Sequence, residues 1–229
     1  MPRYRTVLFD ADNTLFDFTS AEKEALSDTL RLCGVTPSEA AAALYSSINR
    51  ELWKMLERGQ ISKDSLKTQR FSRLFAAMHI AADTEKAATA YQEFLSKRAD
   101  LMPGAFEVCR TLSRDMRLYI VTNGTRFVQR SRFSASPINS FFNDIFISDE
   151  IGFEKPHRGF FSAVAKRIEG FSFEETIVIG DSLSSDIMGG NAAGIDTCWF
   201  DPRRSENSEA IPYTYRIEAL EELVPLLLS

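Results

Sequence analysis

The sequence has 229 residues, a net charge of −5 and 44% hydrophobic residues, a composition that is ordinary for a soluble globular protein. Its acidic balance argues against binding to polymeric nucleic acid, which depends on positive charge. No apolar run reaches the ~20 residues of a membrane span, and the three widely spaced cysteines form no zinc-binding pattern. We therefore expect a cytoplasmic protein without a membrane partner.

The first predicted strand covers residues 6–9 and is followed directly by two carboxylates. Its letters, TVLF, are apolar and rich in β-branched and aromatic residues, which is typical of a buried strand. Asp10 and Asp12 come next. Ligands of open α/β sheets bind at the carboxyl ends of strands, but two aspartates can also close a strand as a turn. Taken alone, the pair fits either interpretation.

From about residue 20 onward the sequence predicts helices and no strand. Apolar residues recur at helical spacing in roughly four segments, and helices joined by short loops form a bundle. The pair Pro103-Gly104 then marks a change of pattern. The sequence therefore predicts a helical insertion, residues 18–98, in a core domain made of residues 1–17 and 99–229.

After this breaker pair, strands alternate with helices. Further strands are predicted at 118–121, 146–147, 176–179 and 197–200. The alternation implies a parallel sheet with helices on both of its faces. The predicted fold class is therefore α/β, with the helical bundle inserted after the first strand.

Two of the later strands also end in polar residues. Thr122 and Asn123 follow the second strand, and Asp181 and Asp186 follow the fourth. Lys155 precedes a predicted helix N-terminus, where a lysine opposes the helix dipole but a bound anion is favoured. Each residue also has an ordinary explanation as a turn, a cap or a solvated side chain. A parallel sheet, however, brings its strand ends to one edge, so we expect these residues to gather beside the first carboxylate pair.

The gathered side chains suit a metal and a phosphoryl group. Clustered carboxylates repel one another unless a cation joins them, and oxygen ligands without His or Cys favour Mg²⁺. Thr122, Asn123 and Lys155 are donors for phosphoryl oxygens. Asp10 can attack phosphorus, because aspartate forms aspartyl-phosphates. Asp12 can give a proton to the leaving oxygen and later take one from water.

The stretches DADNT, TNG, KP and GDSLSSD, in this order, resemble the four motifs of the haloacid dehalogenase (HAD) superfamily. The helical insertion resembles the C1 cap of that family. The resemblance implies a Rossmann-like core of three α/β/α layers and an aspartyl-phosphate intermediate. It also implies that Asp10 is the nucleophile, that Asp12 is the acid/base, and that Thr122 and Lys155 bind the phosphoryl group.

The same resemblance implies Mg²⁺ as the cofactor. Its ligands would be Asp10, the backbone carbonyl of Asp12, and Asp181, while Asp186 would support the site through water. Haloacid dehalogenases lack the second aspartate of the first motif. The presence of Asp12 therefore argues for phosphate chemistry.

Three stretches resemble the bacterial pyrimidine 5′-nucleotidases: FDADNTLFDF, INRELWKMLERGQIS and GDSLSSDIMGGNAAGIDTCWF. This implies a small phosphorylated metabolite as the partner, a (deoxy)pyrimidine nucleoside monophosphate. The alternative is a HAD phosphatase or phosphomutase for another metabolite such as a sugar phosphate, since the two readings differ only in the cap. A non-enzymatic phosphate-binding scaffold is disfavoured, because it would not need the acid/base aspartate. Monomer and homodimer both stay open.

Substrate choice is expected to lie in the helical insertion. Trp53 can stack on a base, since aromatic faces serve flat partners. Asn49 lies four residues earlier on the same helix face, where its amide can pair with a base edge. Phe16 and Phe18 can complete an apolar wall at the entry to the insertion. The competing interpretation is that Trp53 packs between the helices of the insertion.

Overall fold

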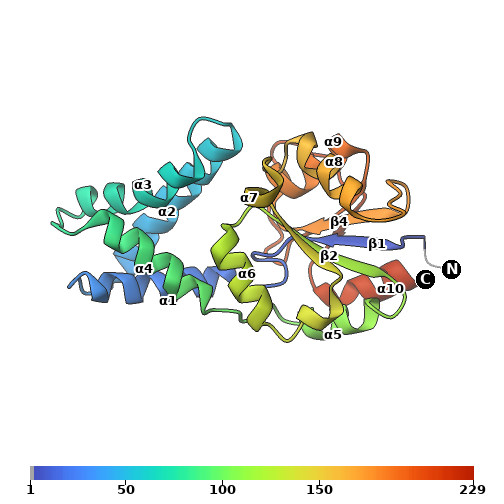
Figure 1. Cartoon of the computed structure of the whole chain (residues 1–229), viewed down its shortest axis with the longest axis horizontal. Helices are drawn as coiled ribbons and strands as arrows, with labels where there is room; N and C mark the ends of the chain where they lie inside the picture. The colour runs from blue at the N-terminus through green and yellow to red at the C-terminus, as the bar shows by residue number, and fades with distance from the viewer. Residues whose placement is uncertain (1–2) are drawn as a thin grey trace. The chain divides into compact units, whose positions relative to one another are not determined.

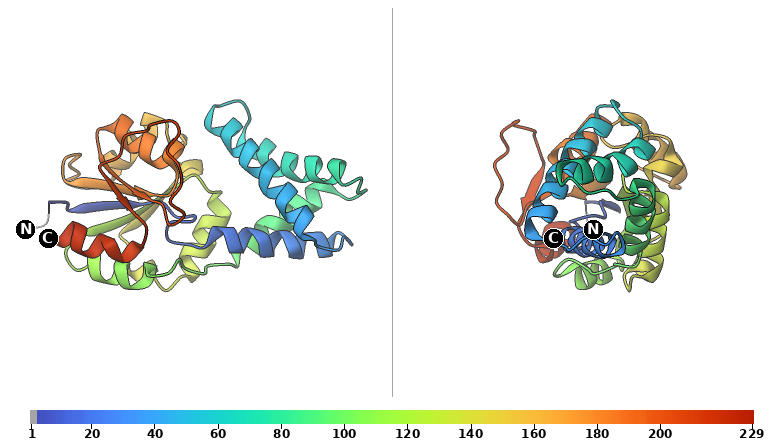
Figure 2. Two further views of the ribbon diagram at one scale, coloured as in Figure 1. Left: turned by 180° about the vertical axis from the view of Figure 1, so that it is seen from behind. Right: turned by 90° about the vertical axis from the view of Figure 1, so that its left-hand side faces the viewer.

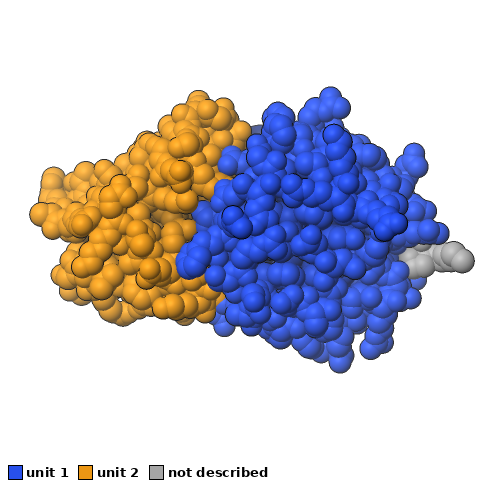
Figure 3. All heavy atoms as spheres, viewed as in Figure 1, with its two compact units in different colours: residues 1–18, 99–229 blue, residues 19–98 orange. Residues whose placement is uncertain are grey.

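The computed structural model describes residues 3–229, and the chain divides into two compact units (Figure 3). Residues 1–18 and 99–229 form one, which we call the core unit. Residues 19–98 form the other, which we call the helical unit. None of the helices in the described part of the chain combines the length and apolar character that crossing a membrane requires.

The core unit contains a six-stranded sheet, counted over residues 3–229. Its strands are β1 Thr6–Phe9, β2 Arg117–Thr122, β3 Asp144–Ile147, β4 Thr176–Gly180, β5 Asp196–Phe200 and β6 Tyr215–Ile217. Every neighbouring pair is parallel, and the order is β3-β2-β1-β4-β5-β6. The chain therefore runs from β1 to one side for β2 and β3 and continues on the other side with β4. Ligands of open α/β sheets bind at such a reversal of strand order.

Helices cover both faces of this sheet (Figures 1 and 2). The α-helices of the core unit are α5 Ala105–Leu112, α6 Arg126–Ala135, α7 Ser148–Ile151, α8 Arg158–Arg167, α9 Met188–Ala193 and α10 Leu223–Leu228. Short turns of other kinds are the 3₁₀ helices η1 Asn139–Phe141 and η3 Leu220–Glu222 and the π-helix η2 Leu183–Ile187. Val7 and Phe9 of β1 pack in one core cluster with residues of α5 and α10, whereas Leu8 packs in a second cluster with residues of α8. A strand buried on both faces is apolar throughout, which explains the unbroken TVLF run.

The helical unit is made of four helices within the described residues. They are α1 Phe18–Leu32, whose first residue belongs to the core unit, α2 Glu39–Glu57, α3 Lys63–Ala77 and α4 Thr84–Ser96. The side chains of Ser38 and Ser62 accept a hydrogen bond from a backbone amide in the first turns of α2 and α3, which stabilises a helix start. In the interior, the rings of Tyr45, Phe71 and Tyr91 pack with centroids 5.5–5.6 Å apart.

The predicted fold class, an α/β parallel sheet with helices on both faces and an inserted helical bundle, is confirmed. One strand was missed. β6 has only three residues, of which one is exposed, and so short a segment shows neither a period nor an apolar run.

Candidate active site

The side chains expected to carry chemistry lie at the ends of the central strands. The last residue of β1 is in register with Ile120 of β2 and Ile179 of β4. Asp10 follows β1, Thr122 ends β2 and Asp181 follows β4. The parallel pairing therefore brings three separate stretches of the sequence to one edge of the sheet, at the reversal of strand order.

Lys155 connects these strand ends from inside the protein. Its side chain is 1% exposed. The ammonium donates to Asp10 Oδ1 at 2.7 Å, to Asp186 Oδ1 at 2.6 Å and to the carbonyl of Val121 at 2.7 Å. Burial acts to lower the pKa of Lys155, but the charges of Asp10 and Asp186 outweigh it and raise the pKa. Lys155 is therefore a fixed positive charge between two carboxylates.

Asn123 holds the segment that carries this lysine. Its Oδ1 accepts from the Lys155 amide and its Nδ2 donates to the Lys155 carbonyl, both at 2.8 Å. Both ends of the Asn123 amide thus hold the Lys155 backbone, and because one N–H of Nδ2 is left over, phosphate binding by Asn123 stays a prediction. Thr122 is buried, and its hydroxyl accepts from the Gly124 amide at 3.0 Å. A hydroxyl that accepts one hydrogen bond still has a proton to donate.

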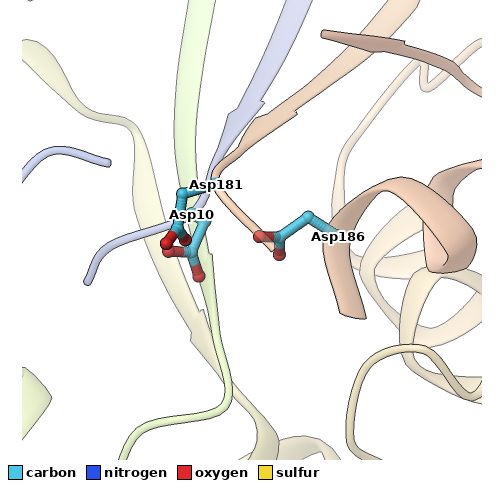
Figure 4. Close-up of side chains that lie close together, drawn as sticks. All are labelled: Asp10, Asp181 and Asp186. Atoms are coloured by element: carbon cyan, nitrogen blue, oxygen red, sulfur yellow. The ribbon is translucent and has the colours of Figure 1, made fainter. Parts of the chain in front are cut away.

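Asp10, Asp181 and Asp186 face one another (Figure 4). One carboxylate oxygen of each lies within 4.8 Å of those of the other two. Burial raises the pKa of Asp10 to about 7 against the opposing charge of Lys155. Burial and the neighbouring carboxylates likewise raise the pKa of Asp181 well above its usual range. Three carboxyl groups lie around a single ammonium here, so one positive charge is too little to balance them.

This cluster fits a divalent cation. Its donor atoms are all oxygens, which Mg²⁺ prefers, and an added cation would offset the repulsion between the carboxylates. Asp186 is already engaged, because Oδ1 accepts from Lys155 and Oδ2 accepts from the Ser182 amide at 3.1 Å. Gly180 leaves the space for that carboxylate, since a Cβ there would lie 2.3 Å from Asp186 Oδ2. Asp10 and Asp181 are thus better placed than Asp186 to ligate a metal directly.

The side chain of Asp12 is bound by helix α6. Oδ1 accepts from Arg132 Nη1, and Oδ2 accepts from Gln129 Nε2 at 2.6 Å. Neither partner was predicted, because RFVQRSRF has three arginines in eight residues and is typical of a solvated helix. A signal was present, since positions 128, 129, 132 and 133 share one helix face at spacings of three and four. Val128 and Phe133 make part of this face apolar, and Gln129 and Arg132 lie on it with them.

Phe16 and Phe18 pack against this arginine. The guanidinium carbon of Arg132 lies 4.6 Å from the ring centroid of Phe16 and 6.0 Å from that of Phe18. Phe16 is fully buried and belongs to the main core cluster of the core unit. The prediction that Phe16 forms a wall toward substrate is therefore corrected: its ring fixes Arg132. Phe18 is half-buried.

Asn49 and Trp53 lie on α2 of the helical unit. Asn49 is buried, and its Nδ2 donates to Glu22 Oε1 at 2.6 Å. Trp53 is half-buried and packs beside the cluster of Leu52, Leu56 and Leu66. The position of Trp53 favours the packing interpretation over a stacking surface.

Comparison with known proteins identifies the family. A family model for haloacid dehalogenase-like hydrolases matches residues 4–194. The chain is 41% identical to YfnB of Bacillus subtilis (strain 168) over 227 residues, covering 99% of this chain and 97% of YfnB. It is 40% identical to the pyrimidine 5′-nucleotidase PynA of Streptococcus pneumoniae over 225 residues, covering 98% of this chain and 95% of PynA. The pyrimidine 5′-nucleotidase YjjG of Escherichia coli (strain K12) is 28% identical over 221 residues, with 96% of each chain covered.

A solved structure agrees with these sequence matches. The orthorhombic crystal form of Bacillus subtilis YfnB, bound to magnesium, superposes with a TM-score of 0.94 at 41% identity and covers 98% of this chain and 99% of that one. The predicted superfamily and the prediction of a hydrolytic enzyme are thus confirmed, and the chain belongs to the haloacid dehalogenase-like hydrolase family.

Proposed function

We propose that this hydrolase is a Mg²⁺-dependent phosphatase that acts on (deoxy)pyrimidine nucleoside 5′-monophosphates through an aspartyl-phosphate on Asp10. The observation that carries the reaction is the buried hydrogen-bonded group in which Lys155 bridges Asp10 and Asp186 beside Asp181. The substrate class is supported by the near-full-length similarity to PynA and YjjG.

Asp10, Asp181 and the backbone carbonyl of Asp12 would hold the metal, with Asp186 in support. Magnesium in the YfnB crystal, at 41% identity, supports this choice of ion. When bound, the cation would offset the negative charge of the phosphoryl group and of the carboxylates as they approach one another.

In the first half-reaction Asp10 attacks phosphorus, and the bond from phosphorus to the ester oxygen breaks. Asp12 gives a proton to that leaving oxygen, so the nucleoside departs as an alcohol. The Lys155 ammonium and the Thr122 hydroxyl stabilise the charge on the phosphoryl oxygens. Asn123 contributes by fixing the backbone of Lys155.

In the second half-reaction water replaces Asp10 on phosphorus. Asp12, now deprotonated, takes a proton from this water, and inorganic phosphate leaves with the Asp10 carboxylate restored. One carboxyl group serves both steps, because the proton that it gives in the first is regained in the second.

We also propose that the helical unit is a C1-type cap whose side chains set the choice of substrate. Asn49 is its best candidate for base recognition. Its Oδ1 is buried and accepts no hydrogen bond from the described residues, and buried polar atoms usually have a partner. Phe18 stays a candidate for the apolar wall, since its ring is half-buried.

A phosphate-release screen tests the function. It compares UMP, dTMP, CMP, AMP, ribose 5-phosphate and glucose 6-phosphate, with Mg²⁺ and with excess chelator. We expect release that needs Mg²⁺ and is fastest with the pyrimidine nucleotides. Faster release from the sugar phosphates would overturn the substrate class, and no release from any monoester by folded protein with Mg²⁺ would overturn the reaction.

A further inference from the structure

We propose that Gln129 and Arg132 of α6 are positioning residues that hold the Asp12 carboxylate in the orientation needed for proton transfer. The proposal rests on the proposed function of Asp12 as acid and base. Each oxygen of that carboxylate accepts a hydrogen bond from one of the two side chains, Oδ2 from Gln129 at 2.6 Å and Oδ1 from Arg132. With both oxygens fixed, the plane of the carboxylate is defined.

Asp12 and its two partners differ in how deeply they are buried. The side chain of Asp12 is 24% exposed, whereas that of Arg132 is 0% exposed and Gln129 is also buried. A partly exposed aspartate can be solvated without any protein partner. A buried arginine is costly, and apolar residues of similar volume often replace a buried ion pair without loss of stability. The fold therefore keeps a fully buried guanidinium that donates to this carboxylate.

The arginine is fixed from a second direction. The rings of Phe16 and Phe18 lie 4.6 and 6.0 Å from its guanidinium carbon, within the range of cation–π attraction. Both aromatic residues belong to the segment that follows β1, as Asp12 does. Arg132 thus joins α6 to the segment carrying the proposed acid/base group at more than one point.

Gly124 makes room for the glutamine. A Cβ at Gly124 would lie 2.1 Å from Gln129 Nε2, and the backbone of Gly124 is not in the left-handed region. The backbone conformation of the turn therefore does not require glycine at this position. A side chain there would instead collide with the amide group of Gln129. The start of α6 is anchored as well, because the Arg126 amide donates to Asp149 Oδ2 at 2.8 Å.

Loss of this positioning should depend on the leaving group. A nucleoside leaves as an alcohol and needs the proton from Asp12, whereas p-nitrophenolate is a stable anion that can leave without one. Hydrolysis of the aspartyl-phosphate needs Asp12 with either substrate. Variants without the positioning residues should therefore form the intermediate from p-nitrophenyl phosphate at a near-normal rate and hydrolyse it slowly, which produces a burst of nitrophenolate equal to the enzyme concentration.

The test compares Gln129→Leu, Arg132→Gln and Arg132→Lys with wild type and with Arg130→Gln. Arg130 is the matched control, since it lies on the same helix and its ion pair with Glu150, at 2.6 Å, is on the surface. We expect kcat with dTMP to fall about 10- to 100-fold in Gln129→Leu and Arg132→Gln, part of the ~10² to 10⁴-fold effect of a general acid. Arg132→Lys should keep more activity than Arg132→Gln, and the two strongly affected variants should show the burst.

Circular dichroism and thermal unfolding identify variants that do not fold; if Arg132→Gln is one, Gln129→Leu and Arg132→Lys decide the matter. Equal losses with dTMP and p-nitrophenyl phosphate and no burst, or activities equal to those of Arg130→Gln, would overturn the proposal. The Asp12→Asn variant separates a failure of the proposed function of Asp12 from a failure of the positioning role of Gln129 and Arg132. If Asp12→Asn itself shows no burst with p-nitrophenyl phosphate, the proposed function of Asp12 fails; if Asp12→Asn shows the burst and the α6 variants do not, only the positioning role fails.

Discussion

At the scale of single residues, the role proposed for Asp10 gives a direct prediction. Asp10→Asn should abolish turnover, because the amide cannot form the acyl phosphate. Folding should persist with an unfolding temperature at least equal to wild type, since burial already disfavours the charged form and raises the pKa of Asp10 to about 7. Phosphate release and circular dichroism on the same sample check both parts. Wild-type turnover in a folded variant would show that Asp10 is not the nucleophile and would favour the interpretation of Asp10 as a turn residue.

Lys155 gives the opposite expectation for stability. Lys155→Met keeps the length of the side chain but leaves Asp10 and Asp186 facing each other without a counter-charge. Removing one partner of a buried ion pair costs about 3–5 kcal/mol, so the free energy of unfolding should fall by that order, and activity should be lost. Urea titration measures the change. Lys166→Met is the control, because Lys166 is exposed on α8, and an equal small change in both variants would contradict the assignment.

Some residue roles could not be predicted from the sequence, for a physical reason. Asn123 was expected to bind phosphate because of its donors and its place after β2, and its two bonds to the Lys155 backbone were not predicted. Residue type and position predict which groups gather at an edge, not which of them bond to each other. Gln129 and Arg132 were missed as well, because the apolar residues of their helix mark the inward face but nothing in the sequence shows that this face meets Asp12.

At the scale of elements, the sequence predicted most of what brings the site together. The apolar runs at β1, β2, β4 and β5 were visible because each is buried on both faces. Parallel pairing then follows from alternation with helices. Helix α6 was different, since its contribution depends on which face turns inward. Short elements such as β6 contain too few residues to show a hydrophobic period or an apolar run.

The ends of β1, β4 and η2 together predict metal dependence. Excess chelator should abolish phosphate release, and added Mg²⁺ should raise the unfolding temperature, because a ligand at 100 times its Kd stabilises the folded state by about 2.7 kcal/mol. Asp181→Asn should remove that shift. Ca²⁺ should inhibit, since it accepts more ligands in looser geometry than Mg²⁺ and so lets Asp10 bind through both oxygens and lose its attacking atom.

Asp181→Asn also serves to interpret the metal experiment. Its effect on the metal-dependent shift does not require any substrate to be known. Full activity in chelator, or an undiminished Mg²⁺ shift in Asp181→Asn, would show that Asp10, Asp181 and Asp186 do not form the metal site.

At the scale of the whole molecule, the residues of the core site do not explain which substrate is chosen. The proposed reaction uses residues of the HAD motifs for attack on phosphorus and for proton transfer. Nothing in those motifs recognises a base or a sugar. The helical unit contains none of those motifs, so we propose that the selection lies there and test it with two residues of one helix.

Asn49→Ala and Trp53→Ala separate recognition from packing. Trp53 packs beside the Leu52, Leu56 and Leu66 cluster, so its loss should lower stability by about 1–3 kcal/mol and reduce kcat/KM for UMP, dTMP and an aryl phosphate to a similar degree. Asn49 has a buried Oδ1 without a hydrogen-bond partner among the described residues. Its removal should lower kcat/KM for the two nucleotides far more than for the aryl phosphate, which has no base edge to pair with.

Trp53→Ala is the reference for Asn49→Ala, because both residues lie on α2 one turn apart. It measures how much a destabilised helical unit lowers kcat/KM for all three substrates. Only a nucleotide-selective loss in Asn49→Ala beyond that level counts as recognition. If Asn49→Ala lowers kcat/KM equally for all three substrates, its bond to Glu22 at 2.6 Å is a structural link between α1 and α2, and the base must be selected by other residues. A nucleotide-selective loss in Trp53→Ala would instead restore Trp53 as a stacking surface, since the change in packing alone affects the three substrates alike.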